Sequence, residues 1–233
     1  MNLLRHVPNL LTSGNLLCGC LGLISIFENY PIQPAYFIWA ACVFDFCDGF
    51  MARLLKVSSP IGKELDSFAD MVSFGVLPAM VMYQWIDSSS GSSWLVYSSV
   101  TTILFSAFRL AKFNIDTQQT ETFIGLPTPA NALFLTSLVF LPQPIRDVVF
   151  TGSTLSGITL VFSLLLVLPV ELFALKFKDF SWGSNQTRFT FMALSVLLIL
   201  MLKAGALPFI ILSYILISLV GNMFTRMKKM IIV

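Results

Sequence analysis

Long apolar stretches separated by short polar ones occupy most of this chain. A membrane-spanning helix needs about 20 mainly apolar residues, and eight segments approach or reach that length. They cover residues 10–27, 34–55, 63–86, 93–113, 127–142, 153–175, 188–203 and 205–223. The pattern predicts an all-α fold, a polytopic bundle of about eight transmembrane helices. The Gly-Ala-Leu-Pro run at 205–208 allows the last two segments to form either a tight hairpin or one broken helix.

The composition indicates a membrane protein, and the charges predict its orientation. The chain is 56% hydrophobic and 11% charged, whereas soluble domains average about 25% charged residues. If the N-terminus faces the cytoplasm, Arg146 and Lys203 are the only basic residues in outside loops. The inside group holds all the others, including Arg5, Lys176, Lys178, Arg226, Lys228 and Lys229. The positive-inside rule therefore predicts that both termini face the cytoplasm.

Cysteine and histidine give little support to zinc or hydrolase chemistry. The four cysteines all lie in predicted spans, where a free thiol usually behaves as a small apolar side chain: they are Cys18, Cys20, Cys42 and Cys47. His6 is the single histidine, and without a second one near a Ser or Cys a hydrolase triad has no support. The sequence also contains no glycine-rich phosphate loop or dinucleotide motif.

Four aspartates interrupt the apolar pattern of the second and third segments: Asp45, Asp48, Asp66 and Asp70. A charge at the centre of a membrane helix costs about 2.5–3.5 kcal/mol on insertion scales, so these acids require compensation. The i, i+3 and i, i+4 spacings place each pair on one helix face. Because a short connection joins the two segments, we expect an antiparallel hairpin in which the four carboxylates converge near the cytoplasmic surface.

Converging carboxylates are hard oxygen ligands that suit Mg²⁺, Mn²⁺ or Ca²⁺. A pair of such ions about 3.5–4 Å apart is a known clamp for phosphoryl transfer. Gly49 and Ala52 lie on the Asp45 face and leave room there, and Arg53 suits phosphate oxygens. Ser59 and Gly62 in the connection offer a hydroxyl and a backbone N–H. In the alternative interpretation, the acids pair with Arg53, Lys56 and Lys63 for structure alone.

The same residues carry a resemblance to a known family. The chain contains the pattern Asp45-x2-Asp48-Gly49-x2-Ala52-Arg53-x8-Gly62-x3-Asp66-x3-Asp70. This pattern resembles the signature of the CDP-alcohol phosphotransferases, with every fixed position filled. Members of that family are integral to membranes. They transfer a substituted phosphoryl group from a CDP-linked donor to an alcohol and release CMP.

The resemblance implies roles for individual residues. The four aspartates are expected to bind two divalent cations, Mg²⁺ or Mn²⁺, with Asp70 also serving as the general base. The expected contacts to the donor are Asn9, Thr12, Gly49, Ala52, Arg53, Ser59 and Gly62. Asn9 and Thr12 belong to a stretch, 8–12, that resembles another donor-contacting segment. An alternative role for Asn9 is that of helix N-cap, since it precedes an apolar run.

Within the family, residues 8–12, 108–114 and 123–130 resemble membrane-type phosphatidylserine synthases of bacteria and archaea. The likeness implies CDP-diacylglycerol as donor, L-serine as acceptor, a homodimer, and a site on the cytoplasmic face of a prokaryotic cell membrane. It covers about six spans. We therefore expect a family core over residues 1–180 and an added transmembrane hairpin with a basic tail over 181–233.

An amino-acid acceptor needs a partner for its carboxylate. Arg109 and Lys112 lie at the end of the fourth predicted span, and Asn114 adds an amide, so one of these cations is expected to face the serine carboxylate. Snorkelling cations that fix topology are the alternative. Lys112 stands where many relatives carry Arg, which keeps the charge but not the bidentate geometry.

Two rival functions follow from the same residues. A sister transferase would use glycerol 3-phosphate or inositol phosphate, and such acceptors call for a denser basic pocket. A cation or proton transporter would also place carboxylates inside the membrane. The acids lie beside one loop, however, and the inverted repeats common in transporters are not visible in the sequence.

Overall fold

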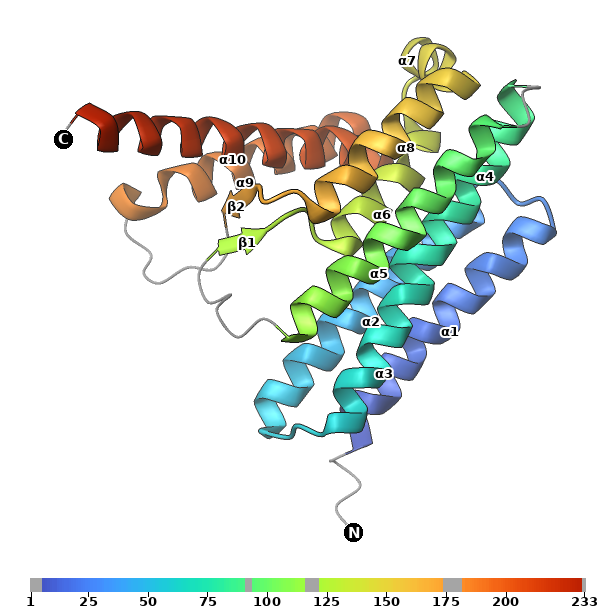
Figure 1. Ribbon diagram of the computed structural model, residues 1–233, viewed down its shortest axis with the longest axis horizontal. Helices are drawn as coiled ribbons and strands as arrows, with labels where there is room; N and C mark the ends of the chain where they lie inside the picture. Colours follow the sequence, from blue (N-terminus) through green and yellow to red (C-terminus); the bar gives the residue numbers. More distant parts are fainter. Residues whose placement is uncertain (1–5, 91–93, 116–121, 174–181, 232–233) are drawn as a thin grey trace.

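The computed structural model describes residues 6–90, 94–115, 122–173 and 182–231, which are mainly helical (Figure 1). Five of its helices begin with a proline in the first turn, where the missing N–H is not needed: Pro8, Pro34, Pro60, Pro129 and Pro144. The elements in chain order are α1 (Val7–Phe27), α2 (Gln33–Leu55), α3 (Pro60–Asp70), the π-helix η2 (Met71–Val76), α4 (Leu77–Ser90), η3 (Leu95–Ser99), α5 (Val100–Ile115), β1 (Thr122–Ile124), α6 (Thr128–Ser137), η4 (Leu138–Phe140), α7 (Gln143–Val149), α8 (Gly152–Val167), β2 (Glu171–Phe173), α9 (Trp182–Leu202), η5 (Lys203–Gly205) and α10 (Ala206–Ile231).

Each of the eight predicted segments contains a helix, and the prediction of a mainly helical fold is confirmed. Among the described residues, four helical stretches are long and apolar enough to cross a membrane: Val7–Phe27, Gln33–Leu55, Pro60–Ser89 and Asn185–Asn222, the last of which contains most of α9, the η5 turn and the first part of α10. A fifth results if Thr128–Phe140 and Gln143–Val149, which are bent by 116°, form one span. The count of eight spans and the orientation stay predictions.

Several residues used in the charge argument are not placed. Arg5, Lys176 and Lys178 lie outside the described residues, as does the predicted domain boundary at 180/181. The basic cluster of Arg226, Lys228 and Lys229 falls in the last turns of α10, where only the backbone is described. The division into a core and an added hairpin therefore stays a prediction as well.

The sixth predicted segment, 153–175, is only partly helical. Helix α8 ends before Leu168, which has an extended backbone. The cause is Pro169, because a proline disfavours the helical conformation of the residue before it. The chain then forms β2, which pairs antiparallel with β1 so that Ile124 lies opposite Glu171. An all-α fold was therefore not fully correct: a small two-stranded sheet joins the ends of α5 and α8 (Figure 1).

The last two helices form a tight hairpin, one of the two predicted alternatives. Lys203 has a φ of 52° and reverses the chain direction between α9 and α10. Gly205 permits the close approach of this turn to η4, since a Cβ there would lie 2.5 Å from the Phe140 carbonyl oxygen. Figure 1 shows the turn of the hairpin against the bundle that contains α1–α5 and α8, with the far ends of α9 and α10 projecting away from it.

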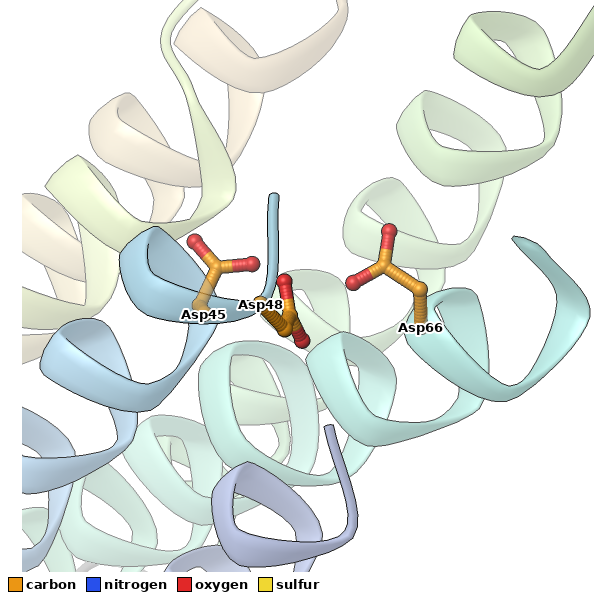
Figure 2. A group of neighbouring side chains, drawn as sticks. All are labelled: Asp45, Asp48 and Asp66. Atoms are coloured by element: carbon orange, nitrogen blue, oxygen red, sulfur yellow. The ribbon is translucent and has the colours of Figure 1, made fainter. Parts of the chain in front are cut away.

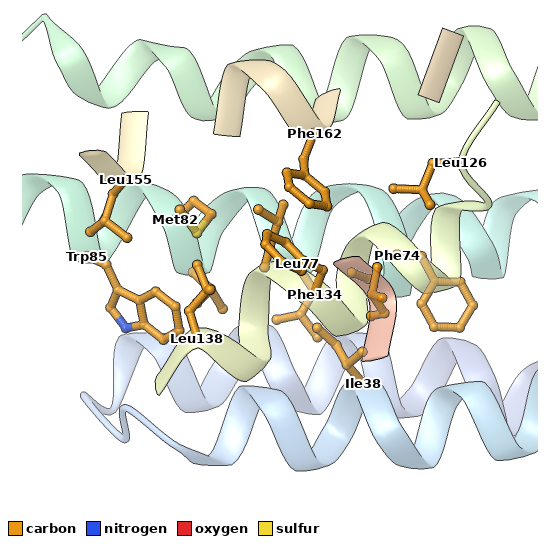
Figure 3. Packing of buried hydrophobic residues seen from close by; sticks show 14 of the residues in the cluster. Ile38, Phe74, Leu77, Met82, Trp85, Leu126, Phe134, Leu138, Leu155 and Phe162 are labelled. Atoms are coloured by element: carbon orange, nitrogen blue, oxygen red, sulfur yellow. The ribbon is translucent and has the colours of Figure 1, made fainter. Parts of the chain in front are cut away.

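The apolar core lies where α4, α6 and α8 meet, behind the aspartate-bearing hairpin (Figure 3). Phe74, Leu77 and Leu135 are fully buried there, and the Phe134 and Phe162 rings stack with centroids 3.6 Å apart. Against the other side of η2 and α4 lies α1, whose small residues allow close packing. Gly19 faces Ser73, and Gly22 faces Leu77.

The close approach of α1 to η2 predicts the effect of one substitution. In Gly19→Ala, the new Cβ would meet Ser73 Oγ and lie 3.1 Å from the Ser73 backbone nitrogen, so α1 must shift. We expect a loss of about 1–3 kcal/mol, typical of overpacking, measured as a lower thermal-unfolding midpoint in detergent. Gly157→Ala is the matched control, because a Cβ there has no neighbour within 4 Å. Equal midpoints for both variants would contradict this packing.

Candidate functional site

The turn between α2 and α3 brings the two aspartate pairs together. Lys56 ends α2 in the left-handed conformation, a common way to stop a helix. Ser59 then caps α3: its Oγ accepts a hydrogen bond from the Gly62 N–H at 2.9 Å. A Ser N-cap followed by Pro60 is a strong helix start. The two helices therefore run in opposite directions from a short connection, residues 56–59, as the sequence predicts.

Three of the four aspartates form a compact group (Figure 2). Asp45 and Asp48 extend from α2 and Asp66 from α3, and one carboxylate oxygen from each lies within 4.8 Å of the others. Asp48 is buried, and the other two are half-buried. Like charges at this separation repel strongly where water is scarce. Converging carboxylate oxygens are suitable ligands for a divalent cation such as Mg²⁺ or Mn²⁺.

The alternative that basic neighbours neutralise the acids does not match the contacts. Among the described residues, the aspartates form no ion pair with Arg53, Lys56 or Lys63. The Lys63 Nζ instead donates a hydrogen bond to the backbone carbonyl of Asn114 at 2.6 Å. Arg53 is exposed and lies beside Gly49, where a Cβ would be 3.5 Å from its Nη1. These three bases therefore do not neutralise the acids through ion pairs.

Asp70 lies beside Asp45 but outside this group of three. It is buried at the end of α3, and its Oδ1 accepts a hydrogen bond from Asn15 Nδ2 at 3.1 Å. Asn15 is itself fully buried, and its backbone carbonyl accepts a hydrogen bond from Ser73 Oγ at 2.9 Å. The structure thus groups three aspartates as one ligand set and fixes the fourth from α1. Sequence reasoning did not identify Asn15.

The backbone widens directly after Asp70. Residues Met71–Val76 form a π-helix, a rare conformation that occurs often at functional sites. Ser73 on this turn is held by α1, and a Cβ on Gly75 would already lie 3.2 Å from Ser106 Cβ on α5. Contacts from two neighbouring helices therefore fix the turn that carries Asp70.

A pocket of about 870 Å³ opens beside the aspartate group. It holds every predicted donor contact except Arg53, together with bases and loop residues that were not predicted. Its lining comprises His6, Pro8, Asn9, Thr12, Asp48, Gly49, Ala52, Lys56, Val57, Ser58, Ser59, Gly62, Lys63 and Asp66. The start of α1, the end of α2 and the start of α3 thus share one cavity.

The first turns of α1 supply a wall of this pocket. The N-cap position belongs to His6, so the alternative role of Asn9 as N-cap is wrong. Asn9 lies instead against the start of α3, where a Cβ on Gly62 would be 2.9 Å from its Oδ1. Thr12 donates to Asp48 Oδ2 at 2.7 Å. A polar stripe of Thr12 and Asn15 in an apolar helix was the available signal for this buried face.

The three residues predicted to contact the acceptor lie in two different places. Asn114 lies against α3, where its Nδ2 donates to Ser67 Oγ at 2.8 Å, next in sequence to Asp66. Arg109 and Lys112 line a second cavity, of about 350 Å³, which shares no lining residue with the first. The Arg109 Nη1 donates to the carbonyls of Ile124 at 2.8 Å and Leu166 at 3.1 Å.

Comparisons with known proteins agree with this site. The family model described as CDP-alcohol phosphatidyltransferase matches residues 5–169. A Bacillus subtilis protein named CDP-diacylglycerol–serine O-phosphatidyltransferase is 36% identical over 142 residues, which are 61% of this chain and 80% of that protein. Proteins of the same name from Helicobacter pylori strain J99 and Methanocaldococcus jannaschii are 33% identical over 143 residues and 40% over 114. The matches cover 60% and 52% of those two relatives, and 60% and 49% of this chain.

The family match extends over both aspartate pairs, the turn that joins them and the α1 wall of the pocket. Most of the chain, including the whole candidate site, therefore belongs to the CDP-alcohol phosphatidyltransferase family.

Proposed function

We propose that the protein transfers the phosphatidyl group from CDP-diacylglycerol to L-serine, giving phosphatidylserine and CMP. The observation that carries the proposal is the group formed by Asp45, Asp48 and Asp66 at the wall of the large pocket. Membership of a transferase family supports the reaction class. The names of the relatives, which specify CDP-diacylglycerol and serine, support the two substrates.

The donor fits the large pocket by size and by chemistry. A volume of about 870 Å³ is in the range of small-molecule and cofactor sites. Ser59 and Gly62 at the start of α3 line the cavity, and helix N-termini favour phosphate groups. Gly49 and Ala52 leave space on α2. We assign the CDP moiety to this pocket, with the acyl chains in the bilayer and Arg53 at its rim.

The four aspartates have the chemistry to hold two divalent cations, Mg²⁺ or Mn²⁺. Asp45, Asp48 and Asp66 would be the shared oxygen ligands, and Asp70 would complete the set. Such ions, when bound, supply charge neutralisation to a diphosphate during its displacement. The Thr12 hydroxyl, which donates to Asp48, orients one of these carboxylates.

Asp70 is assigned as the general base. The Asn15 amide donates to its carboxylate and so fixes its direction. In the proposed step, Asp70 takes the proton of the serine hydroxyl. The serine oxygen then forms a bond to the phosphorus that carries diacylglycerol. The bond from that phosphorus to the CMP oxygen breaks, and CMP leaves.

The acceptor side is supported by Asn114 and its neighbour Lys63. Both lie close to Asp66, and the Lys63 ammonium also lines the large pocket, so it offers a cation to a serine carboxylate. That Arg109 or Lys112 binds this carboxylate stays a prediction. Glycerol 3-phosphate and inositol phosphate are the alternative acceptors, and a direct assay separates them from serine.

Substitution of the proposed base predicts loss of turnover. Asp70→Asn keeps the shape of the side chain but removes the proton acceptor, so we expect CMP release to fall by a factor of about 10²–10⁴. The measurement is CMP formation by purified protein, with the thermal-unfolding midpoint as a check on folding. Asp87→Asn is the matched control, because Asp87 is exposed at the far end of α4. Near-normal turnover in Asp70→Asn would refute the assignment.

Removal of the amide that holds Asp70 predicts a smaller defect. In Asn15→Ala the carboxylate loses its donor on α1, and we expect kcat to fall about 10–100-fold, as for other residues that orient a catalytic group. The KM for CDP-diacylglycerol should change little, because Asn15 does not line the pocket. Ser25→Ala is the control: Ser25 is buried on the same helix but bonds only to the Gly22 carbonyl. An unchanged kcat would remove Asn15 from the site.

An assay of acceptors and metals tests the whole proposal. Purified protein in detergent receives CDP-diacylglycerol, Mg²⁺ or Mn²⁺, and one of serine, glycerol 3-phosphate or inositol phosphate. We expect CMP and phosphatidylserine with serine alone, and no product after chelation of the metal by EDTA. Transfer to a phosphorylated acceptor but not to serine would contradict the serine assignment and leave the family membership intact.

A further inference from the structure

The second cavity contains two cations in apolar surroundings. Phe105, Phe108 and Phe113 of α5 form one side, and Ile124, Leu166 and Val167 form the other; Arg109 and Lys112 are the remaining lining residues. Within the described part of the chain, no carboxylate lines it. Its volume of about 350 Å³ lies within the range of small-molecule sites. The combination of positive charge and apolar wall calls for an anion with an apolar tail.

The two cations differ in their freedom. The Arg109 Nη1 is committed to the carbonyls of Ile124 and Leu166, and the half-buried guanidinium is fixed between α5 and the end of α8. These carbonyls satisfy hydrogen bonds but do not cancel the positive charge. Lys112 lies about one turn further along α5, and its side chain is exposed. One cation is therefore half-buried and held by two carbonyls, and the other is exposed at the rim.

The cavity also lies where lipid is available. Phe108 is 67% exposed and Phe113 51%, so both rings present apolar surface beside the cavity, in a segment (93–113) that the sequence predicts to cross the membrane. Asn114, at the last turn of α5, contacts Ser67 beside Asp66. The last part of α5, which carries Lys112 and Phe113 of the cavity, therefore lies beside α3 and Asp66, near the site to which the proposed reaction assigns the lipid headgroups.

We propose that this cavity is a binding site for an anionic phospholipid, separate from the donor pocket. Arg109 and Lys112 bind the phosphate, and the phenylalanines with Val167 contact the first part of an acyl chain. Basic pockets between transmembrane helices commonly recognise anionic headgroups in this way. The assignment goes beyond the proposed reaction, because the site shares no residue with the pocket for CDP-diacylglycerol.

The test measures binding of lipid in the absence of both substrates, so that its outcome is independent of the proposed reaction. Native mass spectrometry counts phosphatidylglycerol or phosphatidylcholine bound to the purified chain in detergent. We expect the wild type to bind phosphatidylglycerol more tightly. Lys112→Gln should weaken that affinity about fivefold, the effect of one interfacial charge, and Lys112→Arg should retain it. Lys203→Gln, an exposed lysine on the α9–α10 turn, should bind as the wild type does.

Three results would overturn the proposal. The first is equal affinity for the two lipids in the wild type. The second is displacement of phosphatidylglycerol by the same concentration of glycerol 3-phosphate, which would indicate a site for free anions without a tail. The third is a Lys112→Gln variant with unchanged lipid affinity and a raised KM for serine, which would assign Lys112 to the acceptor carboxylate instead. Arg109 is left intact in this test because its two carbonyl contacts hold α5 to the end of α8.

Discussion

Three carboxylates held within 4.8 Å of one another inside an apolar bundle are the constraint on which the rest of this structure depends. Their mutual repulsion opposes folding in the absence of a cation, since few water molecules screen it. Local structure around the three carboxylates holds them in place against this repulsion. The left-handed Lys56 and the Ser59 cap fix the α2–α3 turn, and the Thr12 hydroxyl bonds one carboxylate directly. A preformed group of acids has high affinity for a cation because little has to be reorganised on binding.

Helix α1 shows how a membrane helix is used as a support. Its buried face carries Thr12, Asn15 and Gly19, while Leu10, Leu17 and Ile24 are exposed. This distribution is the reverse of that in a soluble helix, because lipid accepts large apolar side chains and small residues permit close helix contacts. As a result, the polar groups of α1 face the aspartates of α2 and α3, and the glycines bring α1 against η2.

The two cavities contain different charged residues in different surroundings. The large pocket joins two aspartates, the N-terminus of α3 and the bases Lys56 and Lys63, which suits the diphosphate and cations of the proposed donor site. The small one joins two cations with aromatic and aliphatic side chains, which suits one end of a lipid. Asn114 lies between them at the end of α5, and its contacts with Lys63 and Ser67 connect α5 to the wall of the large pocket.

The sequence by itself determined the features that depend on local pattern. Apolar length predicted the helices, and the spacing of Asp45, Asp48 and Asp66 on two faces joined by a short turn predicted their convergence. Tertiary structure decided what depends on contacts between distant segments. The pairing of β1 with β2, the bond from Asn15 to Asp70 and the separation of Arg109 from Asn114 all fall in this class. Periodicity gives the face of a helix, but the neighbour of that face is set by how the whole bundle packs.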